Sequence, residues 1–460
     1  MRTSGVKTAF DVREKRVTVA GAARSGIAAA RLLVARGAHV TLSDRRADVP
    51  EAEPLRQLGV ALELGGHGVD TFATADLVVL SPGVPLEQAA IRAARERGVP
   101  VVGELDLAFR WLRGRVVAIT GTKGKSTTTT LTGRILQAAG FSVAVGGNIG
   151  QPLSAQVDAS TPDMLHVIEA SSFQLELTEA FHPWIAVMLN LSPDHLDRHA
   201  GMEAYAAAKA RIFRNQEAND WAVVNADDPA VLDLARRGRA RACLVSRAPI
   251  PEGVCVEGEW IVERRLESTA RLLPLSAIHL QGPHLLEDVL AAAAVGAIAG
   301  AGSEAITAAV EEFHGLEHAM EFVATIDGVT FVNDSKATNV EAARRSIESY
   351  DEGGLVAILG GRFKGGDLRL LREALRARAR AVVAIGEARP LFRTALSGAV
   401  DVYEADSLEA AVHDAFARAK PRGVVLLAPA CASFDMFQDY AERGRRFKEE
   451  VARLGRASAR

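Results

Sequence analysis

One rhythm repeats along this chain: a short β-branched or aliphatic run, a turn rich in Gly, Ser, Asp or Asn, and then a helical stretch. This alternation predicts parallel strands that form sheets with helices on both faces. The chain has 460 residues, which is room for about three domains of ~150 residues each. The rhythm falls into three blocks with no low-complexity linker between them. We therefore expect an α/β fold with domains over residues 1–103, 104–315 and 316–460.

The second block contains a segment suited to binding phosphate. Residues 121–127 read G-T-K-G-K-S-T, after an apolar strand and before a helix expected over Thr128–Ala139. Glycines let backbone N–H groups approach the oxygens, and Lys125 and the helix N-terminus supply positive charge. The Ser126 hydroxyl is a candidate ligand of Mg²⁺. The loop is shorter than the usual pattern, because Ile119 replaces its first glycine. A glycine turn with a chance lysine is the alternative, which the flanking elements disfavour.

The first block carries a weaker nucleotide signal. Strand 16–20 leads into Gly21-Ala22-Ala23-Arg24-Ser25-Gly26, and a second strand, 38–42, is followed by Asp44. This is similar to a dinucleotide fingerprint whose middle glycine is replaced by Ala23, with Asp44 at the distance of a ribose-binding carboxylate. A purely structural turn explains the pattern equally well. These features predict a Rossmann-like first domain and a P-loop-type mononucleotide-binding second domain with a mostly parallel sheet. The third block, by its own rhythm, is again Rossmann-like.

Polar residues follow several predicted strands, where open α/β sheets bind ligands. Glu169 follows strand 164–168 and is a candidate second ligand of Mg²⁺, or else a surface carboxylate or a partner of a helix N-cap. His195 follows strand 184–189 and suits a Mg²⁺ or a substrate carboxylate, although an ordinary loop histidine is equally compatible. His199 lies four residues further on, but the H-E-x-x-H pattern of a zinc site is absent. Lys209 reads as a helix lysine, and carbamylation by CO₂ is needed to make it a metal ligand.

Composition limits the partners and the compartment. The formal net charge of −3 gives no general attraction to nucleic acid or to anionic membranes. The basic residues Arg443, Arg445, Arg446 and Lys448 alternate with glutamates, so we expect a solvated helix face. Three cysteines make no metal cluster and suit a reducing cytosol. Residues 1–15 lack an apolar signal core, and the Ala/Gly-rich stretch 289–302 is too short to span a bilayer, so a buried helix and a cytoplasmic protein are expected.

Taken in order, the motifs resemble those of the Mur ligases. They read G-T-K-G-K-S-T, E-A-S-S-F-Q-L-E, D-H-L-D-R, A-A-A-K-A-R-I, N-A-D-D, D-S-K-A-T-N and L-G-G-x-x-K-G, with S-P-G in the first block. The resemblance covers essentially the whole chain. The segment A-P-A-C-A-S-F-D-M-F, together with D-S-K-A-T-N, is similar to the branch of the family that adds glutamate.

What the resemblance implies can be stated residue by residue. The UDP-sugar substrate is contacted by Ser25, Asp44, Arg46, Ser81, Asn148 and His195. ATP is contacted by Gly121, Thr122, Lys123, Gly124, Lys125, Ser126, Thr127, Asp288, Asp334 and Lys336. Two Mg²⁺ ions are held by Ser126, Glu169, His195 and a carbamylated Lys209. The amino-acid substrate is contacted by Thr338, Lys364, Ser433 and Tyr440. The groups implied to act in catalysis are Lys125, His195 and Lys209.

The implied activity is ATP-dependent amide-bond formation in cytoplasmic peptidoglycan precursor synthesis. The alanyl carboxylate of UDP-N-acetylmuramoyl-L-alanine attacks the γ-phosphate, and the amine of D-glutamate then displaces phosphate from the acyl phosphate. Both reactants of the first step are anionic, so metal ions and Lys125 must offset their repulsion. Domain closure is expected to exclude water from the acyl phosphate. The protein is expected to act as a monomer.

Two motifs depart from the family pattern. Where relatives have G-x-H-N-x-x-N, residues 282–288 read G-P-H-L-L-E-D, so Leu285 and Asp288 replace asparagines. Where relatives have H-R-x-E, residues 318–321 read H-A-M-E, so Ala319 replaces an arginine. These positions lie around ATP in relatives, which predicts weaker ATP binding or slower turnover. Two alternatives therefore stay open: a related ligase adding another amino acid, and a nucleotide-sugar-binding homologue with impaired catalysis.

Overall fold

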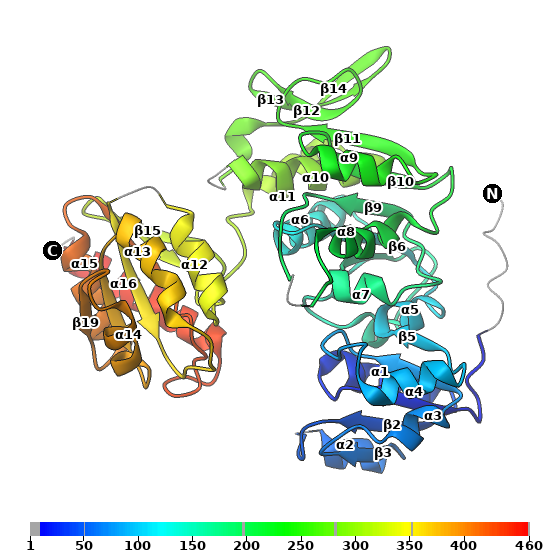
Figure 1. The fold of residues 1–460 in the computed structure, drawn as a ribbon. Helices are drawn as coiled ribbons and strands as arrows, with labels where there is room; N and C mark the ends of the chain where they lie inside the picture. The colour runs from blue at the N-terminus through cyan, green and yellow to red at the C-terminus, as the bar shows by residue number, and fades with distance from the viewer. Residues whose placement is uncertain (1–9, 50, 196–197, 280–282, 351–352, 459–460) are drawn as a thin grey trace. The chain divides into compact units, whose positions relative to one another are not determined.

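A computed structural model describes residues 10–49, 51–195, 198–279, 283–350 and 353–458 (Figure 1). The chain forms two compact units, residues 1–313 and 314–460. Three motif positions discussed above, Leu196, Asp197 and Gly282, lie outside the described residues.

The first unit begins with a five-stranded parallel sheet in the order β3-β2-β1-β4-β5. Its strands are β1 (Arg16–Ala20), β2 (His39–Asp44), β3 (Ala61–Leu64), β4 (Leu77–Leu80) and β5 (Val101–Gly103). Its helices are α1 (Arg24–Ala35), α2 (Ala52–Gln57), α3 (Val69–Ala73) and α4 (Ala89–Glu96). The strand order reverses between β1 and β4, so a ligand crevice is expected at the carboxyl ends of these two strands.

The same unit contains a nine-stranded sheet in the order β14-β13-β12-β11-β10-β9-β6-β8-β7. Its strands are β6 (Arg115–Thr120), β7 (Val143–Gly147), β8 (Leu165–Glu169), β9 (Ile185–Met188), β10 (Trp221–Asn225), β11 (Arg241–Ser246), β12 (Gly253–Glu257), β13 (Trp260–Arg265) and β14 (Ser268–Pro274). The strands from β7 to β12 run parallel, whereas β12, β13 and β14 pair antiparallel. The prediction of a mostly parallel central sheet is confirmed, and this antiparallel edge is an addition to it.

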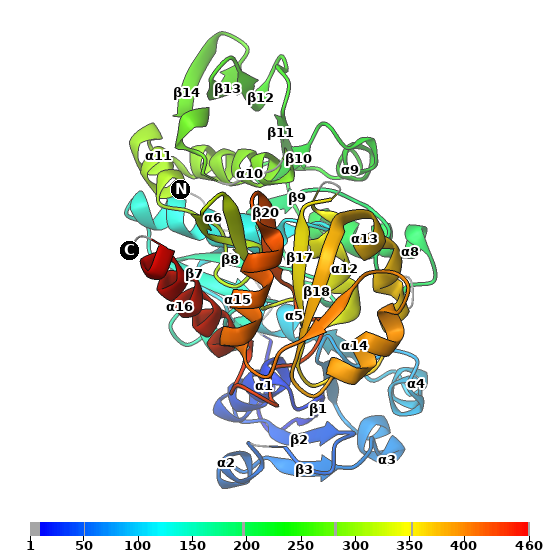
Figure 2. The ribbon, with the colours of Figure 1, turned by 90° about the vertical axis from the view of Figure 1, so that its left-hand side faces the viewer.

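Ten helical segments accompany this sheet in the described part of the unit. They are α5 (Glu104–Phe109), α6 (Lys125–Ala138), η1 (Leu153–Gln156), α7 (Ser172–Glu176), α8 (Met202–Ala210), η2 (Arg211–Phe213), α9 (Pro229–Ala235), η3 (Leu275–Ala277), α10 (Pro283–Ala299) and α11 (Ser303–Glu311). Helix α6 packs against α10 and α11 (Figure 2). Residues 289–295 of α10 are fully buried, which confirms the predicted buried helix. No helix among the described residues has the length and hydropathy that crossing a bilayer requires.

The two sheets of the first unit share hydrophobic cores. Leu32 of α1 packs with Leu105 of α5 and Val116 of β6. Leu177, which follows α7, packs with Ile91 of α4 and Phe72 of α3. Because apolar side chains from both sheets are removed from water together, residues 1–313 behave as one compact unit.

The second unit holds a six-stranded sheet in the order β15-β16-β20-β17-β18-β19, with only β15 antiparallel. Its strands are β15 (Glu321–Ile326), β16 (Val329–Asn333), β17 (Leu355–Gly360), β18 (Ala379–Ile385), β19 (Val402–Glu404) and β20 (Gly423–Leu427). Its helices are α12 (Val340–Glu348), η4 (Leu368–Leu371), α13 (Arg372–Arg378), α14 (Arg389–Leu396), α15 (Leu408–Ala419) and α16 (Tyr440–Ser458).

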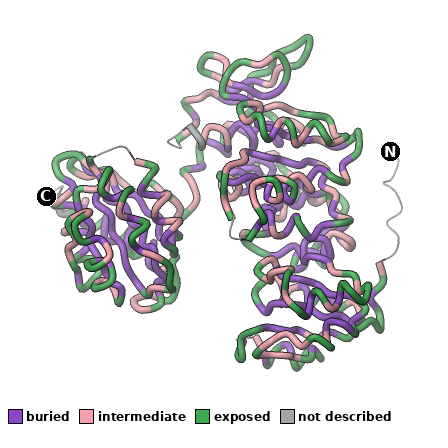
Figure 3. The backbone as a smooth tube through the Cα atoms, in the orientation of Figure 1, coloured by how far each residue is buried: buried purple, intermediate pink, exposed green. Residues whose placement is uncertain are grey.

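Strand β17 illustrates why helices cover both faces of this sheet. Leu355, Ala357 and Leu359 belong to one core, with α12, α13 and α14, while Val356 and Ile358 belong to the other, with α15 and α16. Side chains alternate across a strand, so a continuous apolar run is buried on both sides. The strands accordingly run buried through the middle of the unit (Figure 3).

The prediction for the basic segment near the end of the chain is wrong at one position. Arg445 and Arg446 are exposed on α16, as expected of a solvated face. Arg443, however, is fully buried and is the largest of the fully buried side chains. The alternation with glutamates describes the outer face of the helix, and it does not show that Arg443 lies on the opposite face, toward the sheet.

Candidate active site

The phosphate loop connects β6 to α6. The helix begins at Lys125, three residues before the predicted start at Thr128, so Lys125, Ser126 and Thr127 form its first turn. The backbone N–H groups of a first turn have no partners within the helix and are free to bind an anion. Gly124 has a φ of 81°, and a Cβ there would lie 2.0 Å from Asp288 Oδ1. Only glycine satisfies both the backbone angle and the close approach of Asp288.

Asn190, which follows β9, holds the loop in shape. Its Oδ1 accepts hydrogen bonds from the backbone N–H of Thr122, at 3.1 Å, and of Lys123, at 2.8 Å. Lys125 Nζ in turn donates to the Thr122 carbonyl at 2.8 Å. Asn190 was not among the predicted site residues, although its place directly after a strand was a signal for it.

Glu169, at the end of β8, lies beside the first turn of α6. Its side chain is buried, and Ser126 Oγ donates to Oε2 at 2.6 Å while Asn148 Nδ2 donates to Oε1 at 2.7 Å. The N-cap of α7 is made instead by Ser171, in a capping box with Gln174. Two of the alternatives for Glu169, a surface carboxylate and an N-cap partner, are thereby excluded. The pair Ser126 and Glu169 offers the oxygen donors that Mg²⁺ prefers.

Lys209 of α8 is buried, so it is not an ordinary surface lysine. Its Nζ donates to the Gly121 carbonyl at 2.7 Å and lies 4.7 Å from the centre of the Tyr205 ring. Burial, reinforced by the nearby charge of Lys125, lowers the pKa of Lys209 to about 7. A substantial fraction of this amine is therefore neutral at physiological pH.

The two histidines after β9 have different surroundings. His195 is exposed, has a φ of 54°, and lies 3.7 Å from the Asp194 carboxylate. His199 is buried, stacks on Phe173 with ring centres 5.1 Å apart, and lies 3.0 Å from Ser172 Oγ. Burial lowers the pKa of His199. No group of three or more His, Cys, Asp or Glu side chains arranged for a metal occurs among the described residues.

Asp288 lies beneath the phosphate loop. Thr128 Oγ1 donates to its Oδ1 at 3.1 Å, and its Oδ2 is buried without a hydrogen-bond partner among the described residues. Burial raises the pKa of Asp288 well above its usual value, against the opposing effect of the Thr128 hydrogen bond. These surroundings therefore favour the protonated acid over the carboxylate.

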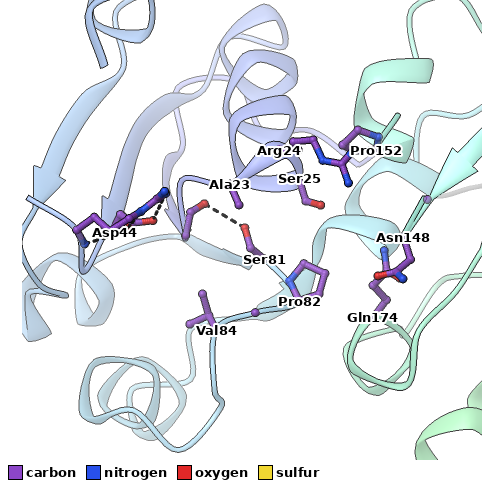
Figure 4. A pocket seen from close by; sticks show the side chains of 14 residues that line it. Ala23, Arg24, Ser25, Asp44, Ser81, Pro82, Val84, Asn148, Pro152 and Gln174 are labelled. Atoms are coloured by element: carbon purple, nitrogen blue, oxygen red, sulfur yellow. Dashed lines mark hydrogen bonds and ion pairs between the residues drawn. The ribbon is translucent and has the colours of Figure 1, made fainter. Parts of the chain in front are cut away.

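A cavity of about 410 Å³ opens at the carboxyl ends of β1 and β4 (Figure 4). Six residues were predicted to contact the UDP-sugar, and all of them except His195 line this cavity: Ser25, Asp44, Arg46, Ser81 and Asn148. Sequence reasoning missed Arg24 and Gln174, which also line it. Arg24 was visible in the fingerprint segment, whereas the position of Gln174 depends on the fold of the second sheet.

Asp44 is fixed as an anion in the wall of this cavity. Its carboxylate accepts hydrogen bonds from the N–H of Ala22 at 2.6 Å and from Arg46 Nε at 3.0 Å. Burial alone would raise the pKa of Asp44, but these hydrogen bonds stabilise the carboxylate by more, and the pKa falls to about 2. On the other wall, Ser81 Oγ donates to the Gly21 carbonyl at 3.0 Å and ties β4 to the turn after β1.

In the second unit, the residues predicted to contact the amino acid lie on three strand-end loops. Thr338 follows β16, Lys364 follows β17, and Ser433 follows β20. The Ala430 N–H donates to the Ala337 carbonyl at 2.9 Å, next to Thr338. Arg362 and Ala432 pair as a short antiparallel bridge next to Ser433. These backbone bonds hold the three loops together at one edge of the sheet.

The remaining predicted residues of this unit lie nearby. Tyr440 is 41% exposed at the start of α16, and its carbonyl accepts from Ser335 Oγ at 2.7 Å. Asp334 is buried, accepts from the Met320 N–H at 3.2 Å and also from Ser346 Oγ, and burial raises its pKa. Lys336, two residues further on, is exposed, and its N–H donates to the His318 carbonyl at 2.9 Å.

Comparison with known proteins places these features in a family context. Residues 15–103 match the N-terminal domain of MurD-like Mur ligases, residues 119–296 the Mur ligase middle domain, and residues 319–431 the Mur ligase glutamate ligase domain. The UDP-N-acetylmuramoylalanine--D-glutamate ligase of Acidobacterium capsulatum is 48% identical over 96% of this chain and 97% of its own length. The protein of the same name from Koribacter versatilis is 45% identical over 97% of this chain and 99% of its own.

Solved structures agree at the level of the fold. The UDP-N-acetylmuramate-alanine ligase MurC of Thermotoga maritima superposes with a TM-score of 0.54 at 19% identity, covering 96% of this chain and 100% of its own. A pseudomurein peptide ligase type C from Methanothermus fervidus gives the same TM-score at 17% identity, with 96% and 100% covered.

Proposed function

This chain belongs to the Mur ligase family, and from that premise we propose that it is an ATP-dependent ligase that adds D-glutamate to UDP-N-acetylmuramoyl-L-alanine. The near full-length identity to proteins named for this reaction supports the substrate pair. In this role the protein supplies a precursor of peptidoglycan for cell wall biogenesis, in the cytoplasm and as a monomer.

The observation that carries the proposal is the double position of Asn148. Its side chain lines the 410 Å³ cavity and also donates to Glu169, which in turn contacts Ser126 of the phosphate loop. Two hydrogen bonds through Glu169 therefore connect the wall of the cavity to the phosphate loop. This continuity suits a reaction in which a group on the cavity ligand attacks a phosphate.

The first step joins two anions, a carboxylate and the γ-phosphate of ATP. A carboxylate oxygen bonds to phosphorus as the bond from phosphorus to ADP breaks, leaving an acyl phosphate. Bound Mg²⁺ supplies Lewis-acid stabilisation of the charge on the phosphate oxygens. Ser126 and Glu169 are suited to hold one such ion. Lys125 and the N–H groups at the start of α6 offset the remaining repulsion.

Lys209 is proposed to bind the second metal as a carbamate, together with His195. A neutral amine attacks CO₂, an N–C bond forms, and the displaced proton passes to solvent, which leaves an anionic oxygen donor. The lowered pKa of Lys209, about 7, supplies the neutral amine. Its burial beside the Gly121 carbonyl keeps it close to the phosphate loop.

In the second step the neutral amine of D-glutamate attacks the acyl carbon, phosphate leaves with the electron pair of the C–O bond, and the nitrogen loses a proton to solvent. Thr338, Lys364, Ser433 and Tyr440 are proposed to bind the amino acid, and Asp334 and Lys336 to contact ATP. The proposed functional division follows the blocks 1–103, 104–315 and 316–460, for the UDP-sugar, ATP and the amino acid respectively.

Phosphate release from ATP tests the proposal directly. The full chain is assayed with UDP-N-acetylmuramoyl-L-alanine and D-glutamate together, with each omitted in turn, and with L-glutamate in place of D-glutamate. Release that needs both substrates and fails with L-glutamate is expected. Release that requires another amino acid would identify a related ligase.

One alternative is favoured by particular residues. Ala319, Leu285 and Asp288 replace polar groups that relatives hold near ATP, which would suit a nucleotide-sugar-binding protein with impaired catalysis. Calorimetric binding of the UDP-sugar without any release of phosphate would support that reading. Measurable turnover at saturating ATP would exclude it.

A further inference from the structure

Arg443 carries a buried charge that the proposed chemistry does not use. It lies on α16 with no exposed surface. In the described part of the chain, every acceptor of its guanidinium is a hydroxyl or a carbonyl oxygen rather than a carboxylate. Burial lowers the pKa of Arg443 to about 10, so the side chain stays a cation at neutral pH. A buried cation whose hydrogen-bond acceptors include no carboxylate is costly to desolvate, and the nearby charge of Asp435 only partly offsets that cost.

The acceptors of Arg443 come from all three strand-end loops of the second unit. Its Nε donates to Ser335 Oγ at 2.9 Å and its Nη2 to the Ser335 carbonyl at 3.0 Å, after β16. Both terminal nitrogens donate to the Cys431 carbonyl at 3.3 Å, after β20. Nη1 also lies 3.5 Å from the Gly360 carbonyl at the end of β17. A single planar fork thus spans three loops that are separated in sequence.

These contacts lie next to the residues that define the proposed amino-acid site. Ser335 is three residues before Thr338, Cys431 is two before Ser433, and Gly360 is four before Lys364. The Ser335 hydroxyl that accepts from Arg443 also donates to the Tyr440 carbonyl at 2.7 Å. Gly361 leaves room for the fork, since a Cβ there would lie 3.2 Å from Nη1.

We propose that Arg443 is the positioning residue of the amino-acid site, because its guanidinium sets the separation of the loops that carry Thr338, Lys364 and Ser433. It touches no substrate and acts through the loops. This inference deepens the proposed function and rests on it for the identity of the amino acid. A lysine at this position has one nitrogen in place of the fork, and it cannot reach three loops at once.

The test compares Arg443→Met, Arg443→Lys and the control Arg446→Gln, an exposed arginine on the same helix. Steady-state rates are measured against D-glutamate and, separately, against UDP-N-acetylmuramoyl-L-alanine, well below the melting temperature of each variant. R443M should raise the KM for D-glutamate about tenfold to a hundredfold, as small displacements of positioned groups do. The KM for the UDP-sugar, which binds in the first unit, should stay within about twofold. The KM of R443K for D-glutamate should lie between those of R443M and the unmodified protein. The KM of R446Q for D-glutamate should equal that of the unmodified protein.

Amide hydrogen exchange on the same proteins gives a readout that does not depend on catalysis. In R443M, residues 334–339, 361–366 and 428–435 should all lose protection while β17 and β20 keep theirs. An unchanged KM for D-glutamate, or exchange altered only around α16, would overturn the inference. Full recovery by R443K would overturn it too, since charge alone would then suffice. If the unmodified protein shows no D-glutamate-dependent turnover, the proposed function fails, and exchange in the three loops still decides whether Arg443 positions them.

Discussion

The central sheet and the C-terminal sheet each bury one cation beneath the loops at the carboxyl ends of their strands. Lys209 donates to the Gly121 carbonyl under the phosphate loop, and Arg443 donates to Ser335 and Cys431 under the proposed amino-acid site. Both are buried, and among the described residues the hydrogen-bond acceptors of each are hydroxyl or carbonyl oxygens. The pKa of Lys209 falls to about 7, whereas that of Arg443 falls only to about 10.

This difference in pKa suits Lys209 to a chemical role and Arg443 to a structural one. A lysine that shares its site with Lys125 can lose its proton near neutral pH and react. An arginine starts from a much higher pKa and remains charged after the same kind of burial, so its five N–H groups stay available as donors. The contrast predicts which properties of the two sites depend on pH and which do not.

The strongest test of the contrast replaces Lys209 with the residue found at the other site. Lys209→Arg keeps a positive charge but removes the amine that can be carbamylated. We expect kcat to fall about 100-fold or more, because a ligand of the proposed second metal is lost. Carbon-13 NMR with labelled bicarbonate should detect a carbamate in the unmodified protein and none in K209R.

The matched control is Lys420→Arg, at an exposed lysine that pairs with Asp327 at 3.2 Å. It should leave kcat unchanged. If K209R kept more than about a tenth of the kcat of the unmodified protein, the proposal that Lys209 is carbamylated and binds a metal would be wrong. Lys209 and Arg443 would then both be buried cations with structural roles only.

A smaller effect is expected in the free energy of unfolding. Between pH 7 and 10 the unfolded protein binds a proton at Lys209 that the folded protein does not, so stability rises with pH in this window. Lys209→Met removes that dependence, so its stabilising effect should be largest below pH 7. There it should exceed the effect of the same substitution at pH 9 by roughly 2 kcal/mol.

Arg443→Met gives the contrasting profile. Arg443 is charged in both states below about pH 9, because burial lowers its pKa only to about 10. The variant should destabilise the protein by the same amount at pH 6 and at pH 9, since it leaves the carbonyls of Cys431 and Gly360 without a donor. Urea unfolding at the two pH values measures the free energy of unfolding of both variants. If the effects of K209M and R443M on this free energy changed with pH in the same way, the proposed difference between the two buried cations would be wrong.

Asp288 extends the comparison to a buried acid under the same phosphate loop. Burial raises its pKa, so the folded protein holds a proton that the unfolded chain has lost above about pH 4, and stability falls as pH rises. Asp288→Asn should therefore stabilise the protein more at pH 7.5 than at pH 4. Thermal melting at both pH values tests this, and an equal gain at each would show that ionisation is not the cause.

The smallest expected effect comes from adding a cation to the second unit. The family pattern that the sequence resembles has an arginine where this chain has Ala319, so Ala319→Arg should lower the KM for ATP about threefold or more. Arg446→Gln, on the same unit, serves as the control for a change of one charge. If A319R left the KM for ATP unchanged, the hypothesis that Ala319 weakens ATP binding would be wrong.

Much of the fold followed from local sequence patterns. The alternation of apolar runs and turns located β1, β8 and β9 to within about a residue at either end, because strands buried on both faces are continuous apolar runs. The start of α6 was placed three residues late, since Lys125, Ser126 and Thr127 have no apolar period and belong to the helix only through the loop that they close.

The site was predicted less evenly. Glu169, Lys209 and five of the residues that line the cavity were predicted from motif resemblance, and Glu169 also from its place at a strand end. Asn190 was not among the predicted site residues, because its two hydrogen bonds to the phosphate loop depend on β9 lying beside β6. Arg443 was misread because its neighbours on α16 carry the solvent-facing charges.

The amino-acid sequence by itself determined the α/β class, the phosphate loop and the set of strand-end residues, since each depends on periodicity or on short runs of neighbouring residues. Only the tertiary structure decided how the buried charges behave. The pKa of Lys209 depends on Lys125 and on the absence of water around it, and the role of Arg443 depends on three loops that meet only when the sheet forms. Burial and long-range contacts set electrostatic energies, and neither is written in the local pattern of the chain.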